Sequence, residues 1–113
     1  MKIPEQGYLL GVFIGESDKW HGQPLYEAIV LKARELHLAG ATVLRGPMGF
    51  GANSRLHTAK ILRLSEDLPM VIEIVDAKEK IDELLLHIDE MVTEGLVTLE
   101  NVQVIKYRAN VAK

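Results

Sequence analysis

Four short strand patterns and two amphipathic helical patterns follow one another in the order β-α-β-β-α-β, and this order predicts an α+β, ferredoxin-like fold. In that fold, four strands form one antiparallel sheet and both helices pack against the same face. Neither a linker nor a low-complexity segment interrupts the 113 residues. We therefore expect a single domain that spans residues 1–113.

The first half of the chain is predicted to form a strand, a helix and a second strand. Residues 8–14 are a continuous apolar run bounded by glycines, which is typical of a buried central strand. Pro24 suits the first turn of a helix, because its missing N–H has no partner there. Gly40 is expected to end that helix, and residues 41–45 form the second strand. The apolar positions at helical spacing are Leu25, Ile29, Ala33 and Leu36.

The second half repeats the pattern with a strand, a helix and a strand. Residues 70–75 are rich in β-branched side chains and predict the third strand. Asp76 and Glu79 have the spacing of a capping box, and Gly95 is expected to end the second helix. The apolar face of this helix comprises Ile81, Leu84, Leu85, Ile88, Met91 and Val92. Residues 102–108 alternate and predict the last strand, with Val102, Val104, Lys106 and Arg108 on one face.

Two helices cover only one face of such a sheet, although the predicted strands carry apolar side chains on both faces. Val71 and Val75 are examples from the third strand. Large apolar faces are rarely left bare, so we expect the second face to pack against other copies of this chain in a homo-oligomer.

The composition excludes several classes of protein. A net charge of −3 argues against general nucleic-acid binding, and no apolar run is long enough to cross a membrane. The absence of cysteine excludes disulfides and thiolate metal sites. Together with an N-terminus that lacks a signal-peptide core, it predicts a cytoplasmic protein. No serine lies in a nucleophile elbow and no catalytic triad is recognisable, so we do not expect an enzyme.

The most informative segment is the glycine-rich stretch that follows the second strand. Gly46, Gly49 and Gly51 allow close approach of backbone N–H groups to an anion. From residue 36 to residue 65 the chain carries four basic residues and no acidic one. By themselves, three glycines between two strands are more often a plain turn, but unpaired cations beside such a loop favour phosphate binding. The four basic residues are Arg45, Arg55, Lys60 and Arg63.

Three further features leave alternatives open. Residues 52–68 are predicted either as a short helix capped by Ser54 or as a long excursion between strands. Lys106 and Arg108, two residues apart, form either a phosphate clamp or an ordinary charged tail. The cluster Glu16, Asp18 and His21 is a weak metal candidate beside Trp20, which we expect to be a packing anchor.

With this order of elements and this loop, the chain resembles the PII-like superfamily, and more closely a family of small uncharacterised bacterial and archaeal PII-like proteins. The resemblance covers nearly the full length. It is most specific at residues 15–27, 40–46, 49–55 and 64–69. It implies a homotrimer with three inter-subunit clefts that bind an adenine nucleotide (ADP, ATP or AMP), and a loop over residues 46–68 that contacts a regulated protein such as a transporter or channel.

The resemblance also implies which residues would hold the nucleotide. The base is expected near the backbone of residues 40–42 and 94–97, and the phosphates near the glycine loop and the C-terminal basic pair. The full set is Gly40, Ala41, Thr42, Arg45, Gly46, Gly49, Phe50, Gly51, Arg55, Glu94, Gly95, Leu96, Val97, Lys106 and Arg108.

The sequence departs from the PII pattern after the second helix. PII chains carry a threonine-glycine element and then glycine-aspartate-glycine-lysine, whereas residues 93–100 here have one glycine, no lysine and two acids. The cations of the glycine-rich stretch are therefore expected to take a larger share of phosphate binding. The alternative hypothesis is a metal-responsive or ligand-free trimeric adaptor that resembles divalent-cation-tolerance proteins.

Overall fold

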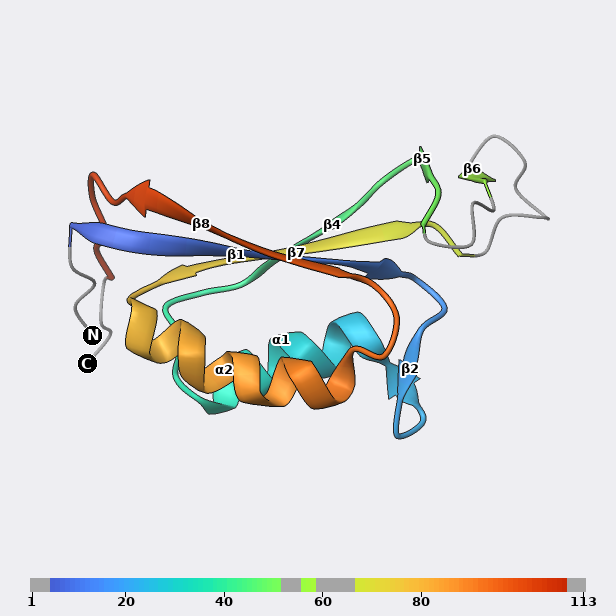
Figure 1. Cartoon of the computed structure of the whole chain (residues 1–113), viewed down its shortest axis with the longest axis horizontal. Coiled ribbons are helices and arrows are strands. Elements are labelled where there is room, and N and C mark those ends of the chain that lie inside the picture. The colour runs from blue at the N-terminus through green and yellow to red at the C-terminus, as the bar shows by residue number, and fades with distance from the viewer. Residues whose placement is uncertain (1–4, 52–55, 59–66, 110–113) are drawn as a thin grey trace.

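The computed structural model describes residues 5–51, 56–58 and 67–109, and it shows a four-stranded antiparallel sheet with two helices on one face (Figure 1). The strands lie in the order β4-β7-β1-β8. This arrangement confirms the predicted α+β, ferredoxin-like fold. The sheet strands are β1 (Gln6–Gly15), β4 (Thr42–Arg45), β7 (Pro69–Asp76) and β8 (Leu96–Gln103), and the helices are α1 (Leu25–Glu35) and α2 (Lys78–Met91).

The core lies between the helices and the sheet. Alternate side chains of β1 and β7 point into it, as the period of a strand requires, and they meet the apolar stripes of both helices. The periodic apolar positions predicted for the helices are buried or partly buried, which confirms both helical faces. The residues in the core with no more than 2% exposure are Leu10, Val12, Ile29, Ala33, Ile72, Ile74, Ile81, Leu84 and Ile88.

Two small strand pairs extend from one end of the sheet. β2 (Lys19–Trp20) and β3 (Gln23–Pro24) form a hairpin that the sequence did not predict. Its two turn residues, His21 and Gly22, both have positive φ, which is typical of a type I′ turn. The second pair joins β5 (Met48–Gly49) to β6 (His57–Thr58). The helix considered near residue 54 is therefore wrong at residues 56–58, and its remaining positions, with the cap at Ser54, lie outside the described residues.

The helix ends differ from the predicted ones. Helix α1 ends at Glu35, before Gly40, and His37 adopts the left-handed φ of 63° that was expected of a glycine. The N-cap of α2 is Ala77, without a side-chain cap, so the capping box expected from Asp76 and Glu79 is wrong. Helix α2 ends at Met91, and Gly95 lies beyond it at the turn into β8.

The last strand starts six residues earlier than predicted, at Leu96 instead of residue 102, because its position is set by its partner. β8 pairs with β1 from Leu96, opposite Phe13, to Gln103, opposite Gln6. The ladder stops where β1 begins, and Val104 N donates the next hydrogen bond to Glu5 O at 2.6 Å. Lys106 and Arg108 therefore follow the strand and do not share one face of it.

The face of the sheet opposite the helices carries exposed apolar side chains in the described part of the chain. Phe13 is 40% exposed on this face, and Leu44 is 50% exposed. The strand register places Leu9 beside Val75, and Phe13 between Val71 and Leu96, so these side chains form two apolar patches. A row of Thr42, Glu73, Gly11 and Thr98 lies between the two patches. We call the two patches together the outer sheet face: Leu9, Phe13, Leu44, Val71, Val75, Leu96 and Val102.

Neither α1 nor α2 is long and apolar enough to span a membrane, and the other described residues add no candidate helix.

Candidate functional site

A cavity of about 560 Å³ opens at the end of the sheet where β1 finishes and β7 and β8 begin. It combines four segments that are far apart in the sequence: the end of β1, the glycine stretch at β5, the entry to β7 and the entry to β8. The lining residues are Phe13, Ile14, Gly15, Asp18, Met48, Gly49, Phe50, Gly51, Asp67, Pro69, Met70, Glu94, Gly95 and Leu96.

Several predicted site residues therefore lie together in this cavity. Gly49, Phe50 and Gly51 come from the glycine stretch, and Glu94, Gly95 and Leu96 come from the turn after α2. Only the chain fold brings these two groups together, because more than forty residues separate them in the sequence. Val97 follows on β8, opposite Val12, and does not line the cavity.

Close backbone packing explains why glycines stand at these positions. A Cβ at Gly95 would lie 2.8 Å from the carbonyl oxygen of Phe13, and Gly95 has a φ of 153°. A Cβ at Gly49 would lie 2.9 Å from the ring of Pro69. Gly46 N donates to Pro69 O at 2.8 Å, which fastens the glycine stretch to the start of β7. Gly51 has open space around it.

The chemistry of the lining is mostly apolar and otherwise acidic. Phe13 and Phe50 expose aromatic rings, and Phe50 is 69% exposed. Asp18 and Asp67 also hold the turn after β1: Asp18 Oδ2 accepts from Gly15 N at 2.9 Å, and Asp67 Oδ1 accepts from Ser17 N at 2.8 Å. No lysine or arginine lines the cavity among the described residues. Apolar and aromatic walls with a few polar groups suit a flat organic ring better than a bare polyphosphate.

Arg45 is engaged elsewhere. Its Nη1 lies 2.8 Å from Glu16 Oε2, and the guanidinium is more than half exposed. Arg45 stands opposite Met70, whose side chain is buried in the core, so Arg45 is on the helix side of the sheet. The pair joins the end of β4 to the turn after β1 and fixes the root of the glycine stretch. Arg55, Lys60 and Arg63 lie outside the described residues.

The candidate metal cluster is not assembled among the described residues. Glu16 pairs with Arg45, and Asp18 accepts a backbone hydrogen bond from Gly15. The ring of His21 stacks on Trp20, with ring centroids 4.1 Å apart. Within the described ranges, no three His, Asp or Glu side chains come close enough together to hold a metal ion. Trp20 packs against the core, which agrees with its expected role as an anchor.

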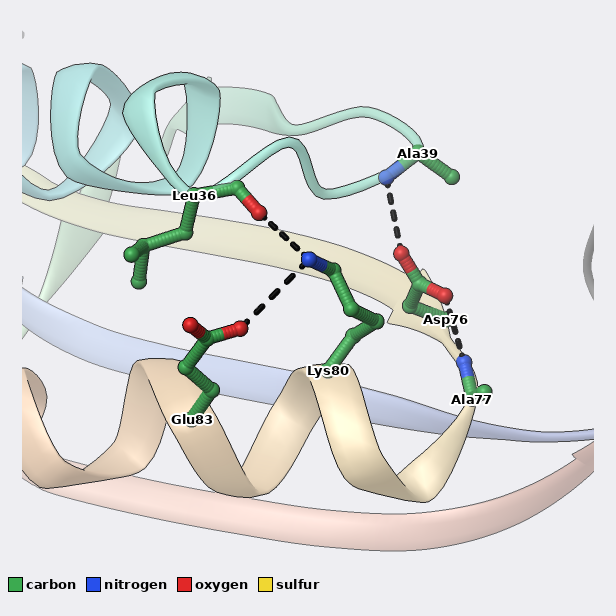
Figure 2. A network of polar contacts seen from close by, with 6 residues as sticks. All are labelled: Leu36, Ala39, Asp76, Ala77, Lys80 and Glu83. Carbon is green, nitrogen blue, oxygen red and sulfur yellow. Dashed lines mark hydrogen bonds and ion pairs between the residues drawn. The ribbon is translucent and has the colours of Figure 1, made fainter. Parts of the chain in front are cut away.

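The remaining predicted site residues gather around the turn between α1 and β4, at the opposite end of the sheet. Figure 2 shows how polar contacts hold this turn. Asp76 accepts from Ala39 N at 2.8 Å through Oδ2 and from Ala77 N at 2.6 Å through Oδ1. Lys80 Nζ donates to Leu36 O at 2.6 Å, which places a cation at the C-terminal end of α1. Gly40, Ala41 and Thr42 follow this turn directly.

The C-terminal basic pair belongs to this same end. Tyr107 Oη donates to Ala39 O at 3.2 Å, so the segment with Lys106 and Arg108 lies beside the turn. Along β1, the turn is near Tyr8, which pairs with Asp76, whereas the cavity is near Gly15, which pairs with Pro69. At roughly 3.3 Å per residue, these two positions are about 23 Å apart. One chain therefore divides the predicted site residues between two distant places.

Sequence reasoning missed several residues that line or support the cavity. Phe13, Met48, Asp67 and Pro69 line it, and Asp76 fixes the opposite end. In the sequence, Phe13 reads only as part of a buried strand. Pro69, at the first position of β7, packs against Gly46 and Gly49, but no local pattern in the sequence indicates this contact. The only sequence feature that pointed to this region was the small and polar residues at the ends of the predicted strands.

A model of the DUF190 family, described as "Uncharacterized ACR, COG1993", matches residues 7–104. A UPF0166 protein of Aquifex aeolicus (strain VF5) is 39% identical over 97 residues, which cover 86% of this chain and 91% of that protein. A UPF0166 protein of Methanocaldococcus jannaschii is 32% identical over 99 residues, with coverage of 87% and 91%.

Solved structures with the same fold are PII-like proteins. CPII, a nitrogen regulatory PII-like protein from Thiomonas intermedia K12, was solved bound to ADP, AMP and bicarbonate. It has a TM-score of 0.69 and 16% identity over 89% of this chain and 90% of that chain. A PII-like signaling protein from Thermus thermophilus has a TM-score of 0.61 and 16% identity, with coverage of 88% and 90%. At this identity the likeness shows the fold, which confirms the resemblance to PII-like proteins.

Proposed function

We propose a function from the premise that this chain belongs to the DUF190 family, which its match over residues 7–104 shows. The proposed function is that of a PII-like regulatory protein. It binds an adenine nucleotide (ADP, ATP or AMP) in clefts between the subunits of a homotrimer, and it regulates a partner protein through the loop 46–68.

The observation that carries this proposal is the cavity at the root of that loop. Its walls combine the glycine stretch with the turn before β8, and the resemblance implicates both segments. A ligand seated there would touch Gly49 and Gly51 directly. Its occupancy would therefore act on the first residues of the loop, which is how a bound ligand can bias the conformation of a signalling segment.

The charge of the cavity supports a site that two subunits complete. A nucleotide carries negative phosphates, whereas the titratable groups in the described lining are the three acids Asp18, Asp67 and Glu94. Lys106 and Arg108 lie about 23 Å away along β1 in the same chain, by the spacing of strand residues. They can reach phosphates in this cavity only from a neighbouring copy. We propose that a neighbour supplies them, together with Arg55 from the loop itself.

The outer sheet face supports the trimer. It presents two apolar patches on the side of the sheet that the helices leave open. Exposed apolar patches of this kind often mark sites of protein–protein interaction. Phe13 and Leu96 belong both to this face and to the lining of the cavity, so copies that pack here would meet beside the cavity.

The ligands of a structural neighbour supply the choice of nucleotide. CPII binds ADP and AMP, and its fold covers 89% of this chain. An aromatic and apolar cavity suits a purine base, which stacks well on phenylalanine rings. We therefore place the adenine in the cavity near Phe13 and Phe50, with the phosphates directed toward the neighbouring basic tail.

Calorimetry with ADP, ATP and AMP tests the nucleotide site. We expect saturable heat of binding and a rise in Tm, because a ligand at about 100 times its Kd stabilises the folded state by about 2.7 kcal/mol. The double variant K106M/R108M should weaken ADP binding by more than tenfold and leave adenosine binding unchanged. Absence of both heat and thermal shift at millimolar nucleotide would contradict the nucleotide site.

Sedimentation of a charged variant tests the assembly. Leu9→Glu places a further carboxylate on the outer sheet face, between Val75 and Glu100. We expect the wild type to sediment as a trimer and Leu9→Glu as a monomer, because an unpaired carboxylate beside another acid is too costly to bury in an interface. Leu86→Glu is the matched control, since Leu86 is 76% exposed on α2. A monomeric wild type, or a trimeric Leu9→Glu variant, would contradict the proposed interface.

A further inference from the structure

The basic tail beyond β8 is held in place by few contacts. Residues 104–109 form no strand, and Lys106 and Arg108 are both exposed. Among the described residues, two hydrogen bonds tie this tail to the body of the protein. Val104 N donates to Glu5 O at 2.6 Å, and Tyr107 Oη donates to Ala39 O at 3.2 Å. Only the second bond is made by a residue that stands between Lys106 and Arg108.

The acceptor of the tyrosine bond is itself firmly held. Ala39 N donates to Asp76 Oδ2, and the Asp76 side chain is only 1% exposed. Three residues earlier, Leu36 O accepts from Lys80 Nζ. Figure 2 shows these contacts converging on the turn from β7 and α2. Tyr107 therefore anchors a loosely held tail to a well-supported backbone group.

Such an anchor matters because Lys106 and Arg108 flank Tyr107 directly. Ordering a free backbone residue costs conformational entropy, and long basic side chains lose rotamer freedom in addition. A tail that is already fixed before binding avoids part of this cost, so its cations bind phosphate more tightly. The hydroxyl of Tyr107 would then contribute to binding without touching the ligand.

We propose that Tyr107 is a positioning residue, which fixes Lys106 and Arg108 against the turn at Ala39 so that they can meet the phosphates of a nucleotide held by a neighbouring copy. This inference rests on the proposed function. It adds a link between the phosphate end of the ligand and the turn that leads into β4.

Tyr107→Phe tests the inference, because it removes the hydroxyl and keeps the ring. In calorimetry we expect ADP affinity to fall roughly three- to tenfold, which corresponds to the loss of one ordinary hydrogen bond. Adenosine affinity should not change, because adenosine has no phosphate for the tail to hold. In the K106M/R108M background, Tyr107→Phe should have no further effect on ADP binding, because the cations that it positions are gone.

Tyr26→Phe is the matched control, since Tyr26 lies on α1 and packs against the core away from the tail. It should leave both affinities unchanged. Unchanged ADP affinity in Tyr107→Phe, or an equal loss for ADP and adenosine, would overturn the positioning role while leaving the nucleotide site intact. A wild type that binds neither ligand would overturn the proposed function and this inference together.

Discussion

Replacing Asp76 with alanine is expected to lower the free energy of unfolding by about 3 kcal/mol. The carboxylate is 1% exposed, and its two oxygens accept from different backbone groups, Ala39 N and Ala77 N. Alanine leaves both donors without this partner, and an unsatisfied buried donor costs about 1–3 kcal/mol. Urea unfolding monitored by circular dichroism measures the change, provided that the slope of the transition stays constant.

Asp76→Asn sharpens the same experiment. Its single carbonyl oxygen can satisfy one backbone donor, while its amide would face the other donor with a second N–H. We therefore expect an intermediate loss of about 1–2 kcal/mol. Asp82→Asn is the matched control, because Asp82 is half exposed and pairs with Lys78 on the surface of α2. That pair should contribute well under about 1 kcal/mol. Asp76→Asn with wild-type stability would show that the two bonds are not both needed.

Gly95→Ala is expected to be the most damaging single change in the cavity, with a loss of about 2–4 kcal/mol in stability. The added Cβ would lie 2.8 Å from the backbone oxygen of Phe13, which cannot rotate away. The φ of 153° adds strain for any residue with a side chain. Because Gly95 lines the cavity between Glu94 and Leu96, the variant should also weaken ADP binding. Urea unfolding and calorimetry on the same preparation measure both effects.

Gly51→Ala is the control for Gly95→Ala. Gly51 lines the same cavity, but a Cβ there would meet no atom within 4 Å. We expect its stability to stay within about 0.5 kcal/mol of the wild type, as for other substitutions in open positions. Equal losses in the two variants would mean that the close approach of Gly95 to Phe13 does not decide the stability of this turn.

The parts of the fold that local patterns determine were predictable. The apolar face of α2 could be read from its spacing, because a helix repeats its contacts every three to four residues whatever it packs against. The continuous apolar run at residues 8–14 likewise indicated a central strand, and β1 pairs on both sides. These features depend on a period within one segment, so a single sequence contains them.

Part of the lining of the cavity was predictable. The glycine stretch and the residues after α2 were named together through the resemblance, and both line the cavity. The pairing of Arg45 with Glu16 was not predictable, because it joins the ends of two strands that meet only across β7. The apolar and acidic lining was hidden for the same reason: Phe13, Pro69 and Asp67 come together only after the sheet has formed.

The sequence by itself determined the order of elements, the faces that the helices bury and the segment from which a loop leaves the sheet. The tertiary structure alone decided the start of β8, since the register with β1 sets that strand and leaves Lys106 and Arg108 beyond it. It also placed these cations about 23 Å along the sheet from the cavity. The physical reason is that periodicity is a local property of the chain, whereas strand register and the meeting of distant side chains depend on partners that a sequence pattern does not name.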